Sequence, residues 1–416
     1  MIGVEAPAMT YPKASLALRA DKFGILPSNI GMLKLRVAYG ETGQLPALDA
    51  AIPITWGSTT GYGGELGYYV QSKGNNAITP ERIKEWEFGI DTEFLNMFSL
   101  EFTHWRQNAS DLIVPSRTSP STGLYRFDYP VNVGEIKAWG FESLLQINPI
   151  RSPDYDLKVS LIWNYQTNEV VDLGETEEIL LDNSEVMRPG LPKYEFYTYV
   201  PIAPKFDPNT QKYIGVILSD ERQALGNPIP DHSGSVSINF RFLKNFNLYA
   251  TGEWALNNYM FSDALNRFWN YNTHVPQRLL AIKLGYHNYG SGQFQPLPID
   301  EGTVPLTPGT PEYIDAAWEY MQYERQSANY VKDASYFVFR ELSLSYNCTD
   351  LLQKYLPNNY VKTLNMGIAV RNVFKTSRYD LGFEVSADGG RSSYLSEDYN
   401  TLQHPRSISF WTKVGI

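Results

Sequence analysis

The chain is poor in charged residues, in cysteine and in long apolar runs. Charged residues make up 19% of its 416 residues, below the roughly 25% of ordinary globular chains. The single cysteine, Cys348, excludes an intrachain disulfide. No run of about 18 apolar residues occurs, which excludes a helical membrane protein. These absences argue against both an ordinary soluble enzyme and a helical membrane protein.

Motifs for catalysis and metal binding are also missing. The sequence has neither a Gly-x-Ser-x-Gly elbow nor a His-Glu-x-x-His pair. The five histidines are scattered without metal-ligand spacing. The net charge of −10 argues against nucleic acid, since phosphate binding needs a basic surface. We therefore expect no enzyme activity, no cofactor, no metal and no nucleic-acid partner.

What the chain does have is aromatic residues and strict alternation. Aromatics make up 14%, including 29 Tyr and 9 Trp. Four segments alternate between apolar and polar or small residues, namely residues 33–40, 156–168, 235–241 and 364–371. In the first segment, one face carries Leu33, Leu35, Val37 and Tyr39, and the other carries Lys34, Arg36, Ala38 and Gly40. Alternation with period two is typical of strands whose faces meet different environments.

Weaker alternation adds six strands, and the C-terminal strand brings the total to about eleven. The weaker segments are residues 14–20, 85–91, 98–106, 141–148, 246–254 and 342–346, and the C-terminal strand is residues 407–416. A tilted strand needs roughly 9–11 residues to cross a bilayer. We expect each of these strands to be a membrane-spanning strand.

The connections between these strands are short and long in turn. The short connections are residues 21–32, 91–97, 148–156, 243–245 and 347–361, and the long ones are residues 41–81, 107–134, 169–234, 255–334 and 372–405. This parity is typical of an outer-membrane β-barrel, with short periplasmic turns at one rim and long extracellular loops at the other. The sequence therefore predicts an all-β fold of that kind.

One long loop is expected to contain a helix. Thr310 is a suitable N-cap, and Pro311 stands at the first helical position. One face would then carry Ile314, Ala317, Trp318 and Met321. We expect this face to pack against its own loop; the alternative is a lid or a partner contact.

Aromatic residues gather in the same loop. They are Tyr259, Phe261, Phe268, Trp269 and Tyr271. Aromatic rings stack on sugars, and a few aligned polar groups then fix the orientation of a ligand. These five residues are candidate ligand-binding residues. Two alternatives stay open: they form the interior of an ordered loop, or they contact a partner protein.

Several segments carry a resemblance to a known family. VNVGEIKAWGFESLLQINPI includes the Asn-Val-Gly and Gly-Phe-Glu steps at residues 132–134 and 140–142. ITPERIKEWEFGIDTEF precedes this segment in the chain, and LGNPIPDHSGSVSINFRFL, ASYFVFRELSLSY, AVRNVF and HPRSISFWTKVGI follow it, all in the family's order. Together these segments resemble the C-terminal half of the SusC/RagA-type TonB-dependent transporters of Bacteroidetes outer membranes.

The resemblance implies import of oligosaccharides or peptides across the outer membrane. It implies a SusD-like surface lipoprotein as a partner, energy from the TonB complex through a plug domain, insertion by the barrel assembly machinery, and contact with outer-membrane lipid. About eleven strands would be half of a 22-stranded barrel. Residues 1–416 are therefore expected to be the C-terminal part of such a barrel, with the plug domain, signal peptide and early strands absent.

The last strand is expected to carry the signal that the assembly machinery reads. Its candidate residues are Phe410, Trp411, Val414 and Ile416. Ile416 departs from the family, whose final residue is usually aromatic. Two other functions stay open for the chain: a truncated barrel fragment that does not transport, and a secreted glycan-binding β-protein.

Overall fold

All eleven expected strands are present and form one antiparallel sheet. The computed structural model describes residues 9–47, 50–52, 55–60, 62–72, 74–117, 128–182, 184–270, 275–286, 302–355, 362–379, 397–398 and 403–415. The strands, in sheet order, are β1 (Lys13–Arg19), β2 (Ile30–Gln44), β5 (Glu81–Phe94), β6 (Phe98–Ser110), β9 (Glu135–Arg151), β10 (Asp156–Asp172), β17 (His232–Phe242), β18 (Phe246–Leu256), β21 (Tyr336–Asn347), β22 (Thr363–Ser377) and β24 (Ser407–Gly415). Sheet order follows chain order throughout, so each strand lies beside its predecessor and its successor. The predicted all-β architecture is confirmed.

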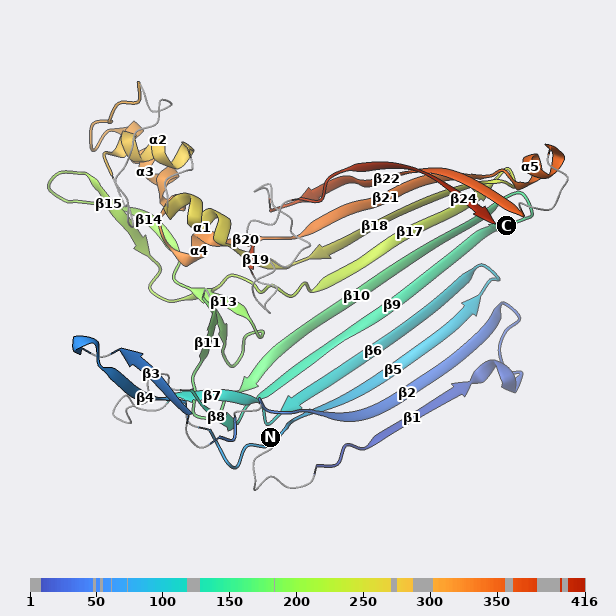
Figure 1. The fold of residues 1–416 in the computed structure, drawn as a ribbon, viewed down its shortest axis with the longest axis horizontal. Helices are drawn as coiled ribbons and strands as arrows, with labels where there is room; N and C mark the ends of the chain where they lie inside the picture. The colour runs from blue at the N-terminus through green and yellow to red at the C-terminus, as the bar shows by residue number, and fades with distance from the viewer. Residues whose placement is uncertain are drawn as a thin grey trace.

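The two ends of the sheet carry different connections. Figure 1 shows the short turns at one end of the curved sheet and the long connections gathered at the other. The tightest turns leave only residues 95–97 between β5 and β6, and residues 243–245 between β17 and β18. The predicted alternation of short and long connections is therefore correct.

The strand register separates polar from apolar side chains across the whole sheet. One row of directly paired residues is polar across eight strands: Ser99, Gln146, Ser160, Ser237, Thr251, Glu341, Arg371 and Ser407. The neighbouring row, one residue along each strand, holds Leu100, Leu145, Leu161 and Val236. Side chains in adjacent rows point to opposite faces. We call these the polar face and the apolar face.

The apolar face is exposed. Leu16 is 68% exposed, Phe88 51% and Phe410 80%. The further sheets within the described residues have two to four strands and lie in the long connections, so none of them forms a second layer over this face. Exposed apolar area of this extent is unfavourable in water. The sheet therefore needs an apolar environment on one side.

The long connections fold into small elements, which we call the loop layer (described residues of 45–80, 111–134, 173–231, 257–335 and 378–406). Its strands are β3 (Thr55–Thr60), β4 (Leu66–Ser72), β7 (Ile113–Arg117), β8 (Asp128–Asn132), β11 (Ile179–Asp182), β12 (Glu185–Met187), β13 (Glu195–Thr198), β14 (Pro201–Phe206), β15 (Tyr213–Leu218), β16 (Gln223–Ala224), β19 (Tyr259–Ser262), β20 (Val331–Asp333) and β23 (Glu397–Asp398). Its helices are α1 (Asp263–Asn270), α2 (Val275–Leu284), α3 (Pro311–Tyr320) and α4 (Ser327–Tyr330). The larger buried apolar clusters lie mainly in this layer rather than in the sheet.

Helix α3 begins where the sequence predicts, but it buries a different face. The Thr310 side chain accepts a hydrogen bond from the Tyr313 backbone N–H, with Pro311 at the first helical position. The buried face carries Tyr313, Ala316, Ala317 and Tyr320. Ile314 and Trp318 are 38% and 51% exposed, so the prediction that they pack against their own loop is wrong. Tyr313 is buried because its hydroxyl accepts from the Tyr213 N–H and donates to the Leu284 carbonyl oxygen, and the Tyr320 ring meets the Tyr213 ring edge to face.

One short connection also contains a helix, α5 (Thr349–Tyr355). Among the described residues, no helix is long and apolar enough to cross a membrane.

Three tryptophans lie over glycines of the neighbouring strand. The directly paired residues are Trp105 with Gly140, Trp254 with Gly234, and Trp411 with Gly367. In each pair the indole occupies the space that a glycine Cβ would need. The bare backbone of glycine therefore lets a large ring lie flat against the sheet.

We predict that Gly140→Ala destabilises the sheet. A Cβ at Gly140 would overlap the Tyr165 carbonyl oxygen and lie 2.9 Å from the Trp105 ring. Overpacking of this kind costs about 1–3 kcal/mol. Gly40→Ala is the matched control, because Gly40 is also paired on both sides and a Cβ there meets nothing within 4 Å. Urea titration should give the larger loss of unfolding free energy for Gly140→Ala; equal losses would contradict this packing.

Candidate functional site

Charged side chains on the polar face pair between neighbouring strands. Arg36 on β2 donates to Asp91 on β5 at 2.7 Å, and Lys34 lies 3.3 Å from the same carboxylate. Towards the opposite edge of the sheet, and still on the polar face, Arg371 on β22 donates to Glu341 on β21 at 3.0 Å. These pairs join neighbouring strands, so opposite charges compensate each other at these positions of the polar face.

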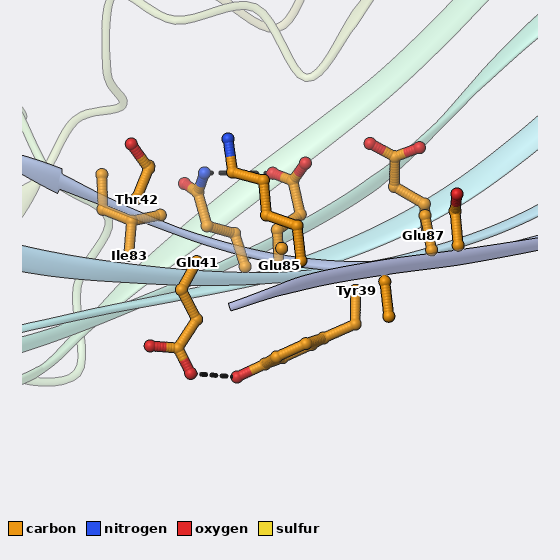
Figure 2. A pocket seen from close by; sticks show the side chains of 12 residues that line it. Tyr39, Glu41, Thr42, Ile83, Glu85 and Glu87 are labelled. Carbon is orange, nitrogen blue, oxygen red and sulfur yellow. Dashed lines mark hydrogen bonds between the residues drawn. The ribbon is translucent and has the colours of Figure 1, made fainter. Parts of the chain in front are cut away.

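A hollow of about 440 Å³ opens between β1, β2 and β5 near their loop ends. Figure 2 shows Thr42, Ile83, Glu85 and Glu87 on one side of the ribbon, with Tyr39 and Glu41 on the other. Glu85 accepts a hydrogen bond from the Gln107 amide at 3.1 Å. We call this the acidic hollow, because two carboxylates on its floor belong to the polar face.

Aromatic side chains mark both ends of the apolar face. Near the loop ends, the rings of Tyr39 and Trp86 lie 4.7 Å apart, centroid to centroid. Near the short turns, a chain of neighbouring rings runs from one hairpin to the next. Its members are Phe240, Phe242, Phe246 and Tyr346, at centroid distances of 5.3, 5.2 and 4.7 Å. Aromatic girdles at both ends of an apolar band are typical of barrels that span a membrane.

A buried network of tyrosines joins two loops of the loop layer. The Tyr213 hydroxyl on β15 donates to Glu324 at 2.9 Å, and the Tyr313 hydroxyl on α3 accepts from the Tyr213 backbone N–H at 2.8 Å. The Tyr213 and Tyr286 rings meet edge to face at 4.7 Å. Burial, together with the neighbouring Glu324 carboxylate, raises the pKa of Tyr213. The neutral hydroxyl is therefore a permanent donor that fixes one loop to the next.

The long connection between β10 and β17 has a half-buried cluster of opposite charges. Glu178 accepts from Arg222 at 2.7 Å and from Arg188 at 3.1 Å. Both guanidinium groups lie over the Tyr197 ring, at 4.7 and 5.4 Å from its centroid. The Arg222 hydrogen bond is the main cause that lowers the pKa of Glu178. The cluster ties β11, β12, β13 and β16 together.

The structure brings two of the predicted loop aromatics, Tyr259 and Phe261, to one buried cluster and leaves Phe268 partly exposed. Phe261 is 4% exposed and meets Tyr330 edge to face at 5.5 Å. Tyr259 is half-buried, and its ring covers Gly226. Phe268 on α1 is 38% exposed. The Trp269 side chain and Tyr271 lie outside the described residues. Ligand binding by these residues stays a prediction, and the burial of Phe261 also suits the alternative that it belongs to the loop interior.

The residues predicted as an assembly signal divide between the two faces of β24. Phe410 and Val414 lie on the apolar face, and Trp411 lies opposite Gly367 on the polar face. Ile416 lies outside the described residues. Their role in assembly stays a prediction. Within the part of the chain that the structure describes, no group of His, Cys, Asp and Glu side chains could hold a metal ion.

Sequence reasoning missed the tyrosine network. The partners in the network lie far apart in sequence: Tyr213 and Glu324 are separated by 111 residues. No local spacing brings such residues together. The only signal was the number of tyrosines in the long connections.

A continuous antiparallel sheet with one polar and one apolar face, and with long loops at one rim, is the wall of a large β-barrel. The family model described as "TonB dependent receptor-like, beta-barrel" matches residues 9–373. The chain belongs to this family.

The chain is similar in sequence to two curated proteins and in fold to a solved structure. The chain is 23% identical to TonB-dependent receptor P39 of Formosa agariphila, over 90% of this chain and 39% of the relative. It is 24% identical to TonB-dependent receptor SusC of Bacteroides thetaiotaomicron, over 64% of this chain and 29% of that protein. The RagAB peptide importer in its closed-closed state aligns with a TM-score of 0.65 and 16% identity, over 91% of this chain and 41% of that chain. The chain thus spans about two fifths, or less, of the length of these proteins.

We predict that the stability of the loop layer depends on pH through Glu195 on β13. This carboxylate is 4% exposed and accepts from the Gly226 N–H at 2.6 Å. Burial raises its pKa above the ordinary value of 4.5, and Asp231 raises it further. The protonated Glu195 side chain therefore contributes its full stabilisation of the loop layer below the ordinary pKa of 4.5. This contribution is lost as the pH rises through the raised pKa of the folded state.

Hydrogen exchange of residues 195–231 should be slower, relative to intrinsic rates, at about pH 5 than at about pH 8. Glu195→Gln should abolish this difference. Glu221→Gln, an exposed carboxylate in the same loop, should preserve it. A pH difference that survives Glu195→Gln would contradict the assignment.

Proposed function

We propose that this chain forms the wall and the outer loops of an outer-membrane transporter that imports oligosaccharides or peptides. In this proposal a SusD-like surface lipoprotein covers the loop layer, and the TonB complex supplies energy through a plug domain. The chain itself has no catalytic role. The support is membership of the TonB-dependent receptor β-barrel family, together with the fold shared with a peptide importer.

The observation that carries the proposal is the exposed apolar face with aromatic rings at both ends. Hydrocarbon stabilises such a face, whereas water does not. The opposite face carries ion pairs and amides, which suit a water-filled or plugged lumen. A secreted glycan-binding β-protein would bury its Leu and Val faces, and the exposure of Leu16 and Phe88 argues against that alternative.

We also propose that this sheet is one section of a larger closed barrel. Among the described residues, β1 and β24 each pair on one side only. Unpaired backbone groups cost several kcal/mol each in hydrocarbon. Closure by further strands of the complete protein removes both edges. The chain expressed alone should therefore give no substrate uptake, as the alternative of a truncated, non-transporting fragment also predicts. Uptake restored by joining the N-terminal half of such a transporter would support the proposal over that alternative.

Arginine at Leu161 tests the lipid-facing assignment. Leu161 stands between Leu145 and Val236 on the apolar face. Leu161→Arg in the complete protein should cost about 2–4 kcal/mol of unfolding free energy if the site is near the midplane. Ser160→Arg, the adjacent residue on the polar face, should have little effect. Urea unfolding in phospholipid vesicles measures both, and equal tolerance at the two sites would refute the assignment.

Epitope insertion tests the orientation. Gly63, between β3 and β4, and Gly302 lie in the loop layer, whereas Asn245 lies in a short turn. Epitopes at Gly63 or Gly302 should bind antibody on intact cells, because long loops are extracellular in such barrels. An epitope at Asn245 should bind only after the cells are broken. The reverse pattern would overturn the orientation.

A further inference from the structure

One tryptophan lies against the polar face of the sheet rather than the apolar face. Trp105 on β6 is directly paired with Gly140 on β9, and a Cβ at Gly140 would lie 2.9 Å from the indole ring. Both residues belong to rows of the polar face, on the loop side of the middle of the sheet. The glycine backbone therefore supports the ring from below, and the side chain stays only half-buried.

Polar side chains of the neighbouring strands surround this ring. Glu87 on β5 is directly paired with Trp105, and Gln166 on β10 is directly paired with Gly140. Glu142 lies two residues along β9 on the same face. Glu142 and Gln166 are exposed. A ligand that stacks on the ring would therefore meet carboxylate and amide groups at its edges.

The acidic hollow opens beside the ring. Its volume of about 440 Å³ is within the size range of small-molecule sites, roughly 300–1,000 Å³. Its lining includes Glu87 and also Gln107, which lies two residues from Trp105 on the same face. Gln107 donates to Glu85, and Figure 2 shows Glu85 and Glu87 on the same side of the ribbon. The ring and the hollow adjoin, and we call them together the lumen site (Glu85, Glu87, Trp105, Gln107, Glu142 and Gln166).

This combination of groups suits a neutral sugar. The face of an indole ring is negative, so it attracts the weakly positive C–H groups on one face of a sugar ring. Sugar hydroxyl groups both donate and accept hydrogen bonds, and carboxylates together with amides match both properties. A ligand carboxylate would be repelled by Glu85, Glu87 and Glu142. An ammonium group needs acceptors only, whereas Gln107 and Gln166 also supply donors.

We propose that the lumen site binds a neutral sugar unit of the imported ligand. Trp105 is the stacking platform, and Glu87, Glu142 and Gln166 fix the orientation of the sugar through its hydroxyl groups. This rests on the proposed function, because it makes the wall of the lumen a binding site on the import route. It also selects oligosaccharides over peptides as the ligand class.

The test measures binding to the purified complete protein in detergent by calorimetry. The neutral probes are maltohexaose, laminarihexaose, xylohexaose and mannohexaose, and the cationic probe is acetyl-Ala-Lys-Ala-amide. At least one hexasaccharide should bind. Its affinity should not change with added salt, because the sugar carries no charge that salt could screen.

Variants then locate the bound sugar. Trp105→Leu should weaken the hexasaccharide by about 30-fold, as expected for the loss of a tryptophan anchor, whereas Trp105→Phe should retain most of the affinity. Glu142→Gln should weaken it by about tenfold, since hydrogen bonds to charged groups are the stronger ones. Trp254→Leu is the matched control, because Trp254 lies over Gly234 in the same way but on the apolar face. It should change affinity by less than about twofold, as expected for a distant site.

Four outcomes overturn the lumen site: no hexasaccharide binds, affinity survives Trp105→Leu, Trp254→Leu causes an equal loss, or only the lysine peptide binds and added salt abolishes its binding. The second outcome is expected if Trp105 packs against a plug domain instead of a ligand. Heat-modifiable migration on a gel checks that each variant is folded. If Trp105→Leu does not fold, Glu142→Gln decides, and unchanged affinity in that variant overturns the site.

Failure of this proposal is distinguishable from failure of the proposed function. A folded, membrane-inserted protein that binds no hexasaccharide removes the lumen site but leaves the proposed import function. Failure of the Leu161 and Ser160 comparison removes the proposed function itself.

Discussion

The antiparallel hydrogen-bond ladder is the constraint on which the rest of the structure depends. In an apolar environment each backbone N–H and C=O needs a partner within the protein. The nine inner strands of the sheet meet this requirement through neighbours on both sides. Because such a ladder fixes register, every second side chain lies on the same face. The polar row through Ser160 and the apolar row through Leu161 both follow from this geometry.

The two rims of the sheet carry different structures. Turns such as residues 243–245 have room only to reverse the chain. The opposite rim carries the loop layer, which has its own buried clusters and its own polar contacts, such as Tyr213 with Glu324. The residues of the loop layer can differ without disturbing the sheet, since backbone pairing fixes the sheet. We therefore expect ligand selection to depend on the loops and on the ends of the strands.

Sequence reasoning succeeded where structure is local and periodic. The alternation from Leu157 to Tyr165 predicts one strand and both of its faces, and Thr310 with Pro311 predicts where a helix begins. Sequence reasoning failed where tertiary packing determines which face of an element is buried. On α3 the apolar positions surround most of the helix, and only the partners of Tyr313 on β15 select the buried face. The place of residues 403–406 beside β22 was also unpredictable, because the hydrogen bond from the Asn372 amide to the Pro405 carbonyl oxygen joins residues 33 positions apart.

The central claim is that one face of this sheet meets lipid and the other meets an aqueous or plugged lumen. The most direct measurement is a nitroxide scan along β10, from Leu157 to Tyr165, in the complete protein reconstituted in vesicles, with Cys348 replaced by serine. Accessibility to oxygen should peak at Leu157, Val159 and Leu161, and accessibility to a water-soluble nickel chelate should peak at the residues between them. Two profiles that rise and fall together, or that lack a period of two, would contradict the account.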